Sequence, residues 1–350
     1  MSQEVNHITK MNFDLAIDAM GGDNAPEVIV KGLSTTAIRH PDVKILLIGD
    51  QNQLKPLLHK YPKVSSICTL RHTSIVVPMD MKPTLALKLR NSSMRMAMES
   101  VACKESRGVV SAGNSGAMLA LAQIIIKTMT GILRPAMAAI SPTAKGDIVM
   151  LDLGANVSCD SRNLVDFAVL GYAFAKAVLG LPKPMIGLLN VGSEEVKGNE
   201  HLKIAAEILR NSSLSDHFHG FIEGHDITAG TTDVVVTDGF TGNIALKTGE
   251  GALKLAFQLL KEVYSSSIRG KLGYLMVKPG LERMKEWLDP RRYNGAVFVG
   301  LNGVVVKSHG GADETSFASA VDVAMDMIKH GFYDEILNAL AQVNPKKTFE

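Results

Sequence analysis

The sequence has 350 residues, of which 46% are hydrophobic and 21% charged, and its formal net charge is +2. This composition is that of a folded chain, not a disordered one, and the length suits one large α/β domain or two smaller lobes. The nearly balanced charge gives no general reason to expect a nucleic-acid partner, so any basic binding site has to be local.

Cysteine usage and apolar segments indicate the compartment. Cys68, Cys103 and Cys159 are odd in number and far apart, which supports neither a disulfide framework nor a structural zinc site. The polar stretch 1–12 lacks a signal-peptide core, and the longest apolar run, near 118–126, is far below the ~20 residues that span a bilayer. We expect a cytoplasmic protein that does not cross a membrane.

Short β-branched runs alternate with longer stretches of helical period. The predicted strands are 14–18, 44–49, 108–111, 136–140, 148–153, 185–190, 234–237, 296–299 and 304–307. The predicted helices are 26–40, 115–128, 162–178, 200–211, 243–264 and 312–329. Strands such as GVV and VVV are apolar on both faces, as in a sheet that helices cover on both sides. The alternation predicts a three-layer α/β/α fold with a mostly parallel, Rossmann-like sheet.

No linker rich in proline, glycine or serine divides the chain. We therefore predict a single catalytic α/β domain over 13–333, with an amphipathic helical insertion over 251–292. The ends, a flexible N-terminal extension over 1–12 and a C-terminal tail over 334–350, are expected to be accessory.

Five predicted strands run into a loop of glycine, asparagine and aspartate and then into a helix. These loops are DAMGGDNAP (18–26), SAGNSGA (111–117), LDLGANVSCD (151–160), LLNVGSEEVKGNE (188–200) and TDGFTGN (237–243). In a parallel sheet such junctions lie at the carboxyl edge, where α/β enzymes bind ligands. Glycine permits close backbone approach, and helix N-termini offer free N–H groups to anions. We expect the five junctions to converge on one edge as an anion site.

SAGNSGA opens the apolar helix MLALAQIII, so Asn114 and Ser115 occupy positions typical of both N-caps and phosphate ligands. The loop is neither GxxxxGK[ST] nor GxGxxG, and Gly116 follows Ser115 directly, unlike the GxSxG elbow of hydrolases. Ser115 is therefore expected to bind a ligand and not to act as a nucleophile. A capped turn without a ligand is the alternative.

Four carboxylates, Asp18, Asp23, Asp152 and Asp238, follow strand ends. Their ordinary role is to cap helices or to accept from loop N–H groups. The alternative is a magnesium ligand or an acid/base group.

Two cationic or titratable side chains stand in similar places. Lys197, near Glu195 in GSEEVKGN, is either half of a solvated charge pair or a contact to an anionic ligand. His309 ends a late strand and precedes a helix, and this position favours ligand contact.

The segment 251–292 combines apolar and basic residues. Leu253, Phe257, Leu260 and Tyr264 share one helical face. From 265 to 292, seven basic and three acidic side chains leave four net positive charges, against +2 for the whole chain. Such a segment fits an anionic membrane surface and equally the acidic helices of a carrier protein, and a dimer-packing helical pair is a third possibility.

In order along the chain, these motifs resemble the bacterial phosphate acyltransferases, the PlsX family of acyl-carrier-protein-dependent enzymes. The shared motifs include SSMRMA, RPA, LDLGAN, DGFTGNIALKT and YNGAVFVGLNGVVVKSHG besides the loops above, from about 13 to 330. The resemblance implies a dimeric α/β/α enzyme similar in fold to phosphotransacetylases and isopropylmalate-dehydrogenase-like enzymes. It also implies reversible formation of acyl phosphate from acyl-[acyl-carrier-protein] and inorganic phosphate for phospholipid synthesis.

The resemblance and the loops together give the expected site. The catalytic candidates are Lys197, Asp238, Asn243 and His309. The candidates for binding phosphate or substrate are Asp18, Gly21, Gly22, Asp23, Gly113, Asn114, Ser115, Gly116, Asn156, Glu195 and Gly242. The chemistry requires positioning of phosphate and donors for the developing oxyanion. No metal or cofactor is expected, and no acyl-enzyme, because no activated serine or cysteine is evident.

The expected partners are acyl carrier protein, inorganic phosphate and a second copy of the chain. Transient contact with an anionic membrane and its glycerol-3-phosphate acyltransferase is also expected, which makes the protein peripherally membrane-associated, and nucleic acid is not expected. One rival class is a metal- and NAD-dependent decarboxylating dehydrogenase, which needs clustered carboxylates and arginines that the sequence lacks in tight spacing. Another is a non-catalytic regulator that binds carrier protein or lipid.

Overall fold

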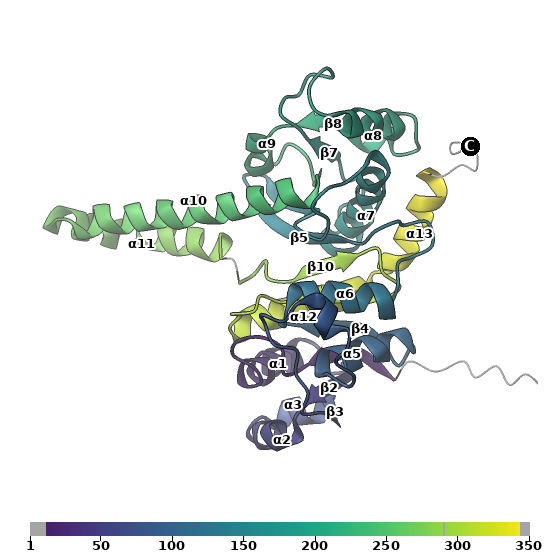
Figure 1. Ribbon diagram of the computed structural model, residues 1–350. Coiled ribbons are helices and arrows are strands. Elements are labelled where there is room, and N and C mark those ends of the chain that lie inside the picture. The colour runs from purple at the N-terminus through teal and green to yellow at the C-terminus, as the bar shows by residue number, and fades with distance from the viewer. Residues whose placement is uncertain (1–11, 290, 344–350) are drawn as a thin grey trace, which may run out of the picture.

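The computed structural model describes residues 12–289 and 291–343, and their core is an 11-stranded sheet (Figure 1). The order across the sheet is β3-β2-β1-β4-β11-β10-β5-β6-β9-β7-β8. The strands are β1 (Phe13–Asp18), β2 (Ile45–Gly49), β3 (Cys68–His72), β4 (Ser106–Ser111), β5 (Ala136–Thr143), β6 (Gly146–Leu151), β7 (Ile186–Leu189), β8 (Phe218–Ile222), β9 (Val234–Val236), β10 (Ala296–Val299) and β11 (Val304–Lys307).

Helices cover both faces of this sheet. They are α1 (Glu27–Arg39), α2 (Gln51–Lys60), α3 (Pro62–Ile67), α4 (Pro83–Ala86), α5 (Ser93–Ala102), α6 (Ser115–Ile125), α7 (Ser161–Leu179), α8 (Glu200–Arg210), α9 (Gly224–Ala229), α10 (Gly239–Ser265), α11 (Ile268–Trp287), α12 (Glu314–Lys329) and α13 (Phe332–Val343). The strand β1 explains the layering. Leu15 and Ile17 join the apolar cluster beneath α1, α7 and α12, whereas Ala16 between them joins the cluster beneath α5 and α6.

The sheet has two halves in which the strands run in opposite senses. In the first half, β3, β2, β1, β4 and β11 are mutually parallel. In the second half, β6, β9, β7 and β8 are mutually parallel. Between the halves, β10 is antiparallel to β11 and β5, and β5 is antiparallel to β6. Figure 1 shows the halves one above the other, with β10 and β5 between them.

The expectation of one shared carboxyl edge is therefore wrong. Only Ala144 and Lys145 connect β5 to β6, and so short a link allows a hairpin but no crossover to a parallel strand. The hairpin reverses the direction of every strand in the second half. The loops after β1 and β4 leave their strands in one direction, and those after β6, β7 and β9 leave their strands in the opposite direction.

The register shows how the two carboxyl edges relate. Lys307, at the end of β11, pairs with Ala296, which the antiparallel register of β10 and β5 places level with Ala139. Ala139 in turn pairs with Met150, the last but one residue of β6. The strands of the two halves thus end at nearly the same level, having arrived from opposite directions on either side of β10 and β5.

The helices α10 and α11 form an arm that projects from the body (Figure 1). The buried residues of α10 are Gly239 and Gly242 at its base, and α11 has none among its described residues. The rings of Tyr264 and Tyr274 pack edge to face at 5.8 Å and join the two helices. The predicted insertion at 251–292 covers most of this arm, although its first helix already begins at Gly239. Across residues 12–289 and 291–343, no helix is long and apolar enough to span a membrane.

The predicted tail needs a correction. Its boundary, after residue 333, falls inside α13, where Phe332, Ile336 and Leu340 are buried in the main apolar cluster. An ion pair of 2.6 Å between Lys176 and Glu335 adds a link to α7. The spacing of the buried residues, i, i+4 and i+8, is that of an amphipathic helix. Residues 1–11 of the predicted extension and 344–350 of the tail lie outside the described residues.

Candidate active site

Three loops meet at the carboxyl edge of the first half, and we call them the first loop group: 18–26 after β1, 111–117 after β4 and 308–313 after β11. The Asp23 N–H donates to the Gly310 carbonyl over 2.9 Å. Gly21 lies so close to the second loop that an added Cβ would sit 2.7 Å from the Gly113 nitrogen. The fold thus brings together the predicted residues of the first two loops and His309.

Asp18 supports this group from inside. Its carboxylate is 1% exposed and accepts a 2.7 Å hydrogen bond from the Ser111 hydroxyl. The same hydroxyl accepts from the Gly113 N–H at 3.0 Å. Burial raises the pKa of Asp18, and the hydroxyls of Ser93 and Ser111 oppose the rise. Through Ser111, the buried carboxyl group braces the start of the 111–117 loop.

Asn114 caps α6 with its side chain. Its Oδ1 accepts from the Ala117 N–H at 3.0 Å, and its Nδ2 donates to the carbonyls of Met79 and Met81 at 2.8 and 2.9 Å. The amide is thus occupied by protein groups, as in the capped-turn alternative. Ser115 and Gly116 are exposed in the first turn of α6, where backbone N–H groups have no partner within the helix. These two residues offer the donors of an anion site.

His309 is exposed and held by its neighbours. Its N–H donates to the Asn294 side-chain oxygen at 3.0 Å, and its Nδ1 accepts from the Gly311 N–H at 3.1 Å. When Nδ1 accepts, the neutral ring carries its proton on Nε2. Asn294 also donates to Ser308 Oγ and to the Ser316 carbonyl, both at 2.8 Å. Sequence reasoning missed Asn294, although its place in the YNG motif shortly before β10 was a usable signal.

The second loop group, 151–160, 188–200 and 237–243, belongs to the second half of the sheet. Asp152 is its buried centre. The carboxylate accepts from the N–H groups of Met137, Ala155 and Asn156 at 2.8, 3.0 and 2.6 Å. The Asn156 side chain donates to Asp152 and to the Pro135 carbonyl, at 2.9 and 2.8 Å. Asn156 is thus an internal brace of the loop.

The base of α10 packs onto this brace. Asp238 caps the helix by accepting from the Thr241 N–H and hydroxyl at 2.9 and 2.8 Å. A Cβ added to Gly242 would overlap the Asp152 carbonyl oxygen, so this close approach requires glycine. Asn243 is exposed, and its Nδ2 donates to the Leu153 carbonyl at 3.3 Å.

Glu195 and Lys197 lie on the exposed loop after β7. Glu195 forms an exposed ion pair of 2.8 Å with Arg210, a different partner from the Lys197 of the predicted solvated pair. The backbone of Lys197 is held instead: its N–H donates to the Glu194 carbonyl at 3.0 Å, and its own carbonyl accepts from Asn190 at 3.3 Å. Lys197 therefore presents an ammonium group from an anchored loop.

The pKa of the Cys159 thiol is affected by the charged residues of the second loop group. Burial raises the pKa of its thiol to about 12, and the charges of Asp152 and Asp238 add to the rise, while Arg134 opposes it. A thiol with this pKa is protonated at neutral pH and is a poor nucleophile. The same effects place Arg134, from the RPA motif, within electrostatic range of Cys159. Among residues 12–289 and 291–343, no group of three or more His, Cys, Asp or Glu side chains could hold a metal ion.

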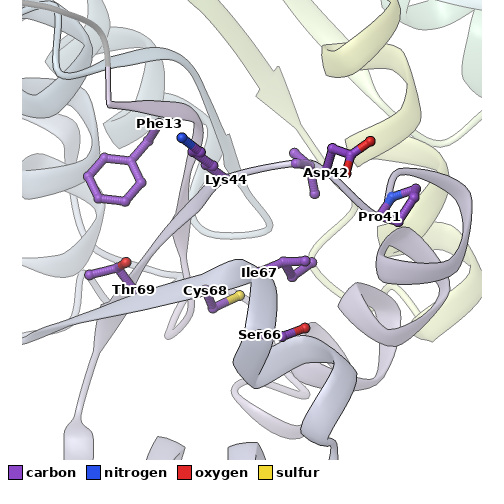
Figure 2. A pocket seen from close by; sticks show the side chains of 9 residues that line it. Phe13, Pro41, Asp42, Lys44, Ser66, Ile67, Cys68 and Thr69 are labelled. Carbon is purple, nitrogen blue, oxygen red and sulfur yellow. The ribbon is translucent and has the colours of Figure 1, made fainter.

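A cavity of about 340 Å³ lies elsewhere (Figure 2). Its lining includes Phe13, Lys44 and Cys68, which stand at the amino-terminal ends of β1, β2 and β3. Ligands of parallel α/β sheets bind at the opposite, carboxyl edge. The loop groups are therefore a better candidate for chemistry than this cavity.

The chain has a three-layer α/β/α fold with helix N-termini and glycine-rich loops at its carboxyl edges, an arrangement at which α/β enzymes commonly bind anions. Residues 13–335 match the model of a family described as "Fatty acid synthesis protein". The phosphate acyltransferase of Gluconacetobacter diazotrophicus is 69% identical over 332 residues, which cover 95% of this chain and 89% of that protein. That of Gluconobacter oxydans is 67% identical over 331 residues, covering 95% and 90%. The chain belongs to the family described as "Fatty acid synthesis protein", which it shares with these phosphate acyltransferases. The resemblance seen in its motifs is therefore confirmed.

The fold comparison agrees. A phosphotransacetylase from Streptococcus pyogenes superposes with a TM-score of 0.63 at 15% identity, covering 91% of this chain and 94% of that one. At this identity the likeness concerns the fold alone. It confirms the predicted α/β/α class and its similarity in fold to phosphotransacetylases.

Proposed function

We propose that this chain is a phosphate acyltransferase that moves a fatty acyl group from the thioester of acyl carrier protein onto inorganic phosphate. A phosphate oxygen attacks the thioester carbonyl, the C–S bond breaks, and the carrier's sulfur leaves as a thiolate, whose conjugate thiol has a pKa of about 8.5. The product, acyl phosphate, supplies phospholipid synthesis. Family membership supports the activity. The structural observation that carries the proposal is the meeting of three glycine-rich loops at the open N-terminus of α6.

Phosphate binds in this proposal to the first loop group. The N–H groups of Ser115 and Gly116 and the positive end of the α6 dipole favour a dianion there. His309 contributes an Nε2–H donor from the neighbouring loop. Asp18, Gly21, Gly22 and Gly113 act by shaping these loops, because they are buried or packed backbone to backbone.

In this proposal the thioester lies toward the second loop group. The strands that lead into this group end at nearly the same level of the sheet as those of the first half. Lys197 and Asn243 are exposed donors suited to a developing oxyanion. Asp238 sets the start of α10 and thereby the place of Asn243. The reaction changes no oxidation state and uses a preformed anion as nucleophile, so we propose that it needs neither cofactor nor metal.

The arm formed by α10 and α11 is the proposed partner surface. Its exposed apolar side chains include Met276, Leu275 and Ile268, at 84%, 65% and 79% exposure. Lys271 and Lys278 stand among them. Apolar area of this extent on an isolated protomer marks an interaction site. We propose that the arm mediates pairing with a second copy and contact with acyl carrier protein and an anionic membrane surface, which makes the protein peripheral to the membrane.

An assay of the purified chain with acyl-[acyl-carrier-protein] tests the proposal. Loss of the thioester should depend on phosphate and produce acyl phosphate without NAD. A decarboxylating dehydrogenase would instead reduce NAD when given a β-hydroxy acid and magnesium. A regulator would bind the carrier protein without turnover. Either of these last two results would refute the proposed function.

A further inference from the structure

Lys307 is a buried cation that is not among the predicted site residues. It ends β11 and is 7% exposed. Its Nζ donates to the Ala112 carbonyl at 3.3 Å and also to the Ser308 carbonyl. Ala112 leads into the start of α6, and Ser308 leads into His309. One ammonium group therefore joins the two loops that carry the proposed phosphate donors.

The charges around Lys307 come from the remaining loop of the first loop group, 18–26. Desolvation lowers the pKa of Lys307 to about 8, whereas Asp18 at the end of β1 and Asp23 in the loop that follows attract the ammonium and oppose the shift. His309 lies two residues further along the same loop as Lys307. Burying an ammonium is costly unless hydrogen bonds and opposite charge compensate for the lost water. The two carbonyls and the carboxyl of Asp18 provide that compensation.

We propose that Lys307 is a positioning residue, which fixes the donors of Ser115 and Gly116 relative to His309. This inference rests on the proposed function, because those groups are the proposed phosphate ligands. The ammonium acts through the loops: its hydrogen bonds go to backbone carbonyls, and its side chain is buried beneath them. An apolar side chain here would leave both carbonyls without this donor, and the two loops would lose their common anchor.

The first test uses Lys307→Met and Lys307→Arg, with Lys44→Met as a control. Lys44 is exposed near the amino end of β2, on the far edge of the sheet. We expect Lys307→Met to raise the phosphate KM by about tenfold or more, the loss typical of a hydrogen bond to a charged group. The KM for acyl-[acyl-carrier-protein] should change less than about threefold. The Arg variant, which keeps the charge, should restore phosphate use to within about threefold, and Lys44→Met should match the unaltered chain.

The second test is the pH profile of the unaltered chain, with Lys307→Arg as the control. The ammonium is present below pH about 8 and is lost as the pH rises through this value. The kcat/KM for phosphate should therefore fall above pH about 8 in the unaltered chain, and the fall should be absent in Lys307→Arg. Inorganic phosphate is already a dianion in this range, so its own ionisation does not cause such a fall.

The outcomes separate the two proposals. An unaltered chain that does not convert acyl-[acyl-carrier-protein] with phosphate refutes the proposed function, and titration calorimetry with inorganic phosphate alone then tests Lys307: binding that weakens in Lys307→Met upholds its role. A phosphate KM unchanged in Lys307→Met overturns the inference and leaves the function intact. If Lys307→Met does not fold, a flat pH profile to 9.5 in the unaltered chain overturns it equally.

Discussion

Gly242 packs directly against the backbone carbonyl of Asp152, leaving no room for a side chain at the base of α10. The contact joins the arm to the buried brace of the second loop group. Gly242→Ala should therefore push α10 away from the loop and destabilise the fold by about 1–3 kcal/mol, as overpacking does. The rate of acyl transfer should also fall, because the shift of α10 displaces Asn243, the next residue and a proposed oxyanion donor.

The control for this change lies in the same helix. Gly249 is exposed, and an added Cβ would meet nothing within 4 Å. Gly249→Ala should leave activity unchanged and stabilise the helix by about 0.5–1 kcal/mol, since alanine is the better helix former. Thermal melts of the two variants check the prediction. Equal melting temperatures would contradict it.

Asn114→Ala should weaken phosphate use more than it weakens carrier-protein binding. The change removes the cap on Ala117 and the donors to the carbonyls of Met79 and Met81, so the first turn of α6 loses its anchors. We expect a loss of about 1 kcal/mol in stability from the cap and a rise in phosphate KM of about tenfold. Asn114→Asp keeps the cap and loses only the donors, so its melting temperature should lie nearer that of the unaltered chain. Unchanged phosphate kinetics in both variants would remove this loop from the site.

Replacing Leu275 and Met276 by aspartate should abolish binding to anionic vesicles while the fold survives, because both side chains are exposed. Binding by the unaltered chain should weaken as salt rises, since screening acts on exposed charges. Leu337→Asp is a matched control: Leu337 is 52% exposed on α13, away from the arm. Vesicle sedimentation at two salt concentrations checks the prediction. Binding and carrier-protein affinity that ignore both salt and these substitutions would make the arm purely structural.

Stability should depend on pH through Lys307. Its folded pKa is about 8 and its ordinary pKa is 10.5, so between these values the unfolded chain binds more protons than the folded one. The free energy of unfolding should therefore rise with pH across this window, by at most about 3–4 kcal/mol for a pKa difference of about 2.5. Lys307→Met should lack this part of the rise. Urea denaturation of both proteins at pH 8 and pH 10 measures the difference, and parallel pH dependences would contradict it.

Most of the fold was accessible from sequence because its strands are buried on both faces. Runs such as Val109–Val110 and Val234–Val236 have few other interpretations. The edge strands β3 and β8 were missed, since residues such as Arg71 and His219 interrupt their apolar pattern. The direction of the second half was also missed, because a strand pattern carries no sign of its sense and only the two-residue link between β5 and β6 revealed the hairpin.

The loops were predicted from sequence, whereas their role as a site stays a prediction. Glycine-rich junctions correctly located the loops, since close backbone contacts need that residue at Gly21 and Gly242. The roles of single side chains were harder to infer. The side chains of Asn114 and Asn156 are of a type that often binds a substrate, yet here they donate to backbone carbonyls. Lys307 was read only as the end of a strand, because its partners come from a loop almost 200 residues earlier in the chain.

The central claim is that phosphate itself attacks the thioester, and isotopic labelling tests it most directly. The purified chain is mixed with acyl-[acyl-carrier-protein] and inorganic phosphate labelled with ¹⁸O in every position, and the mass of the product is measured by mass spectrometry. The account predicts acyl phosphate in which all the phosphate oxygens keep the label, with no acylated protein before phosphate is added. Unlabelled fatty acid as the sole product, or an acyl group on the chain in the absence of phosphate, would contradict it.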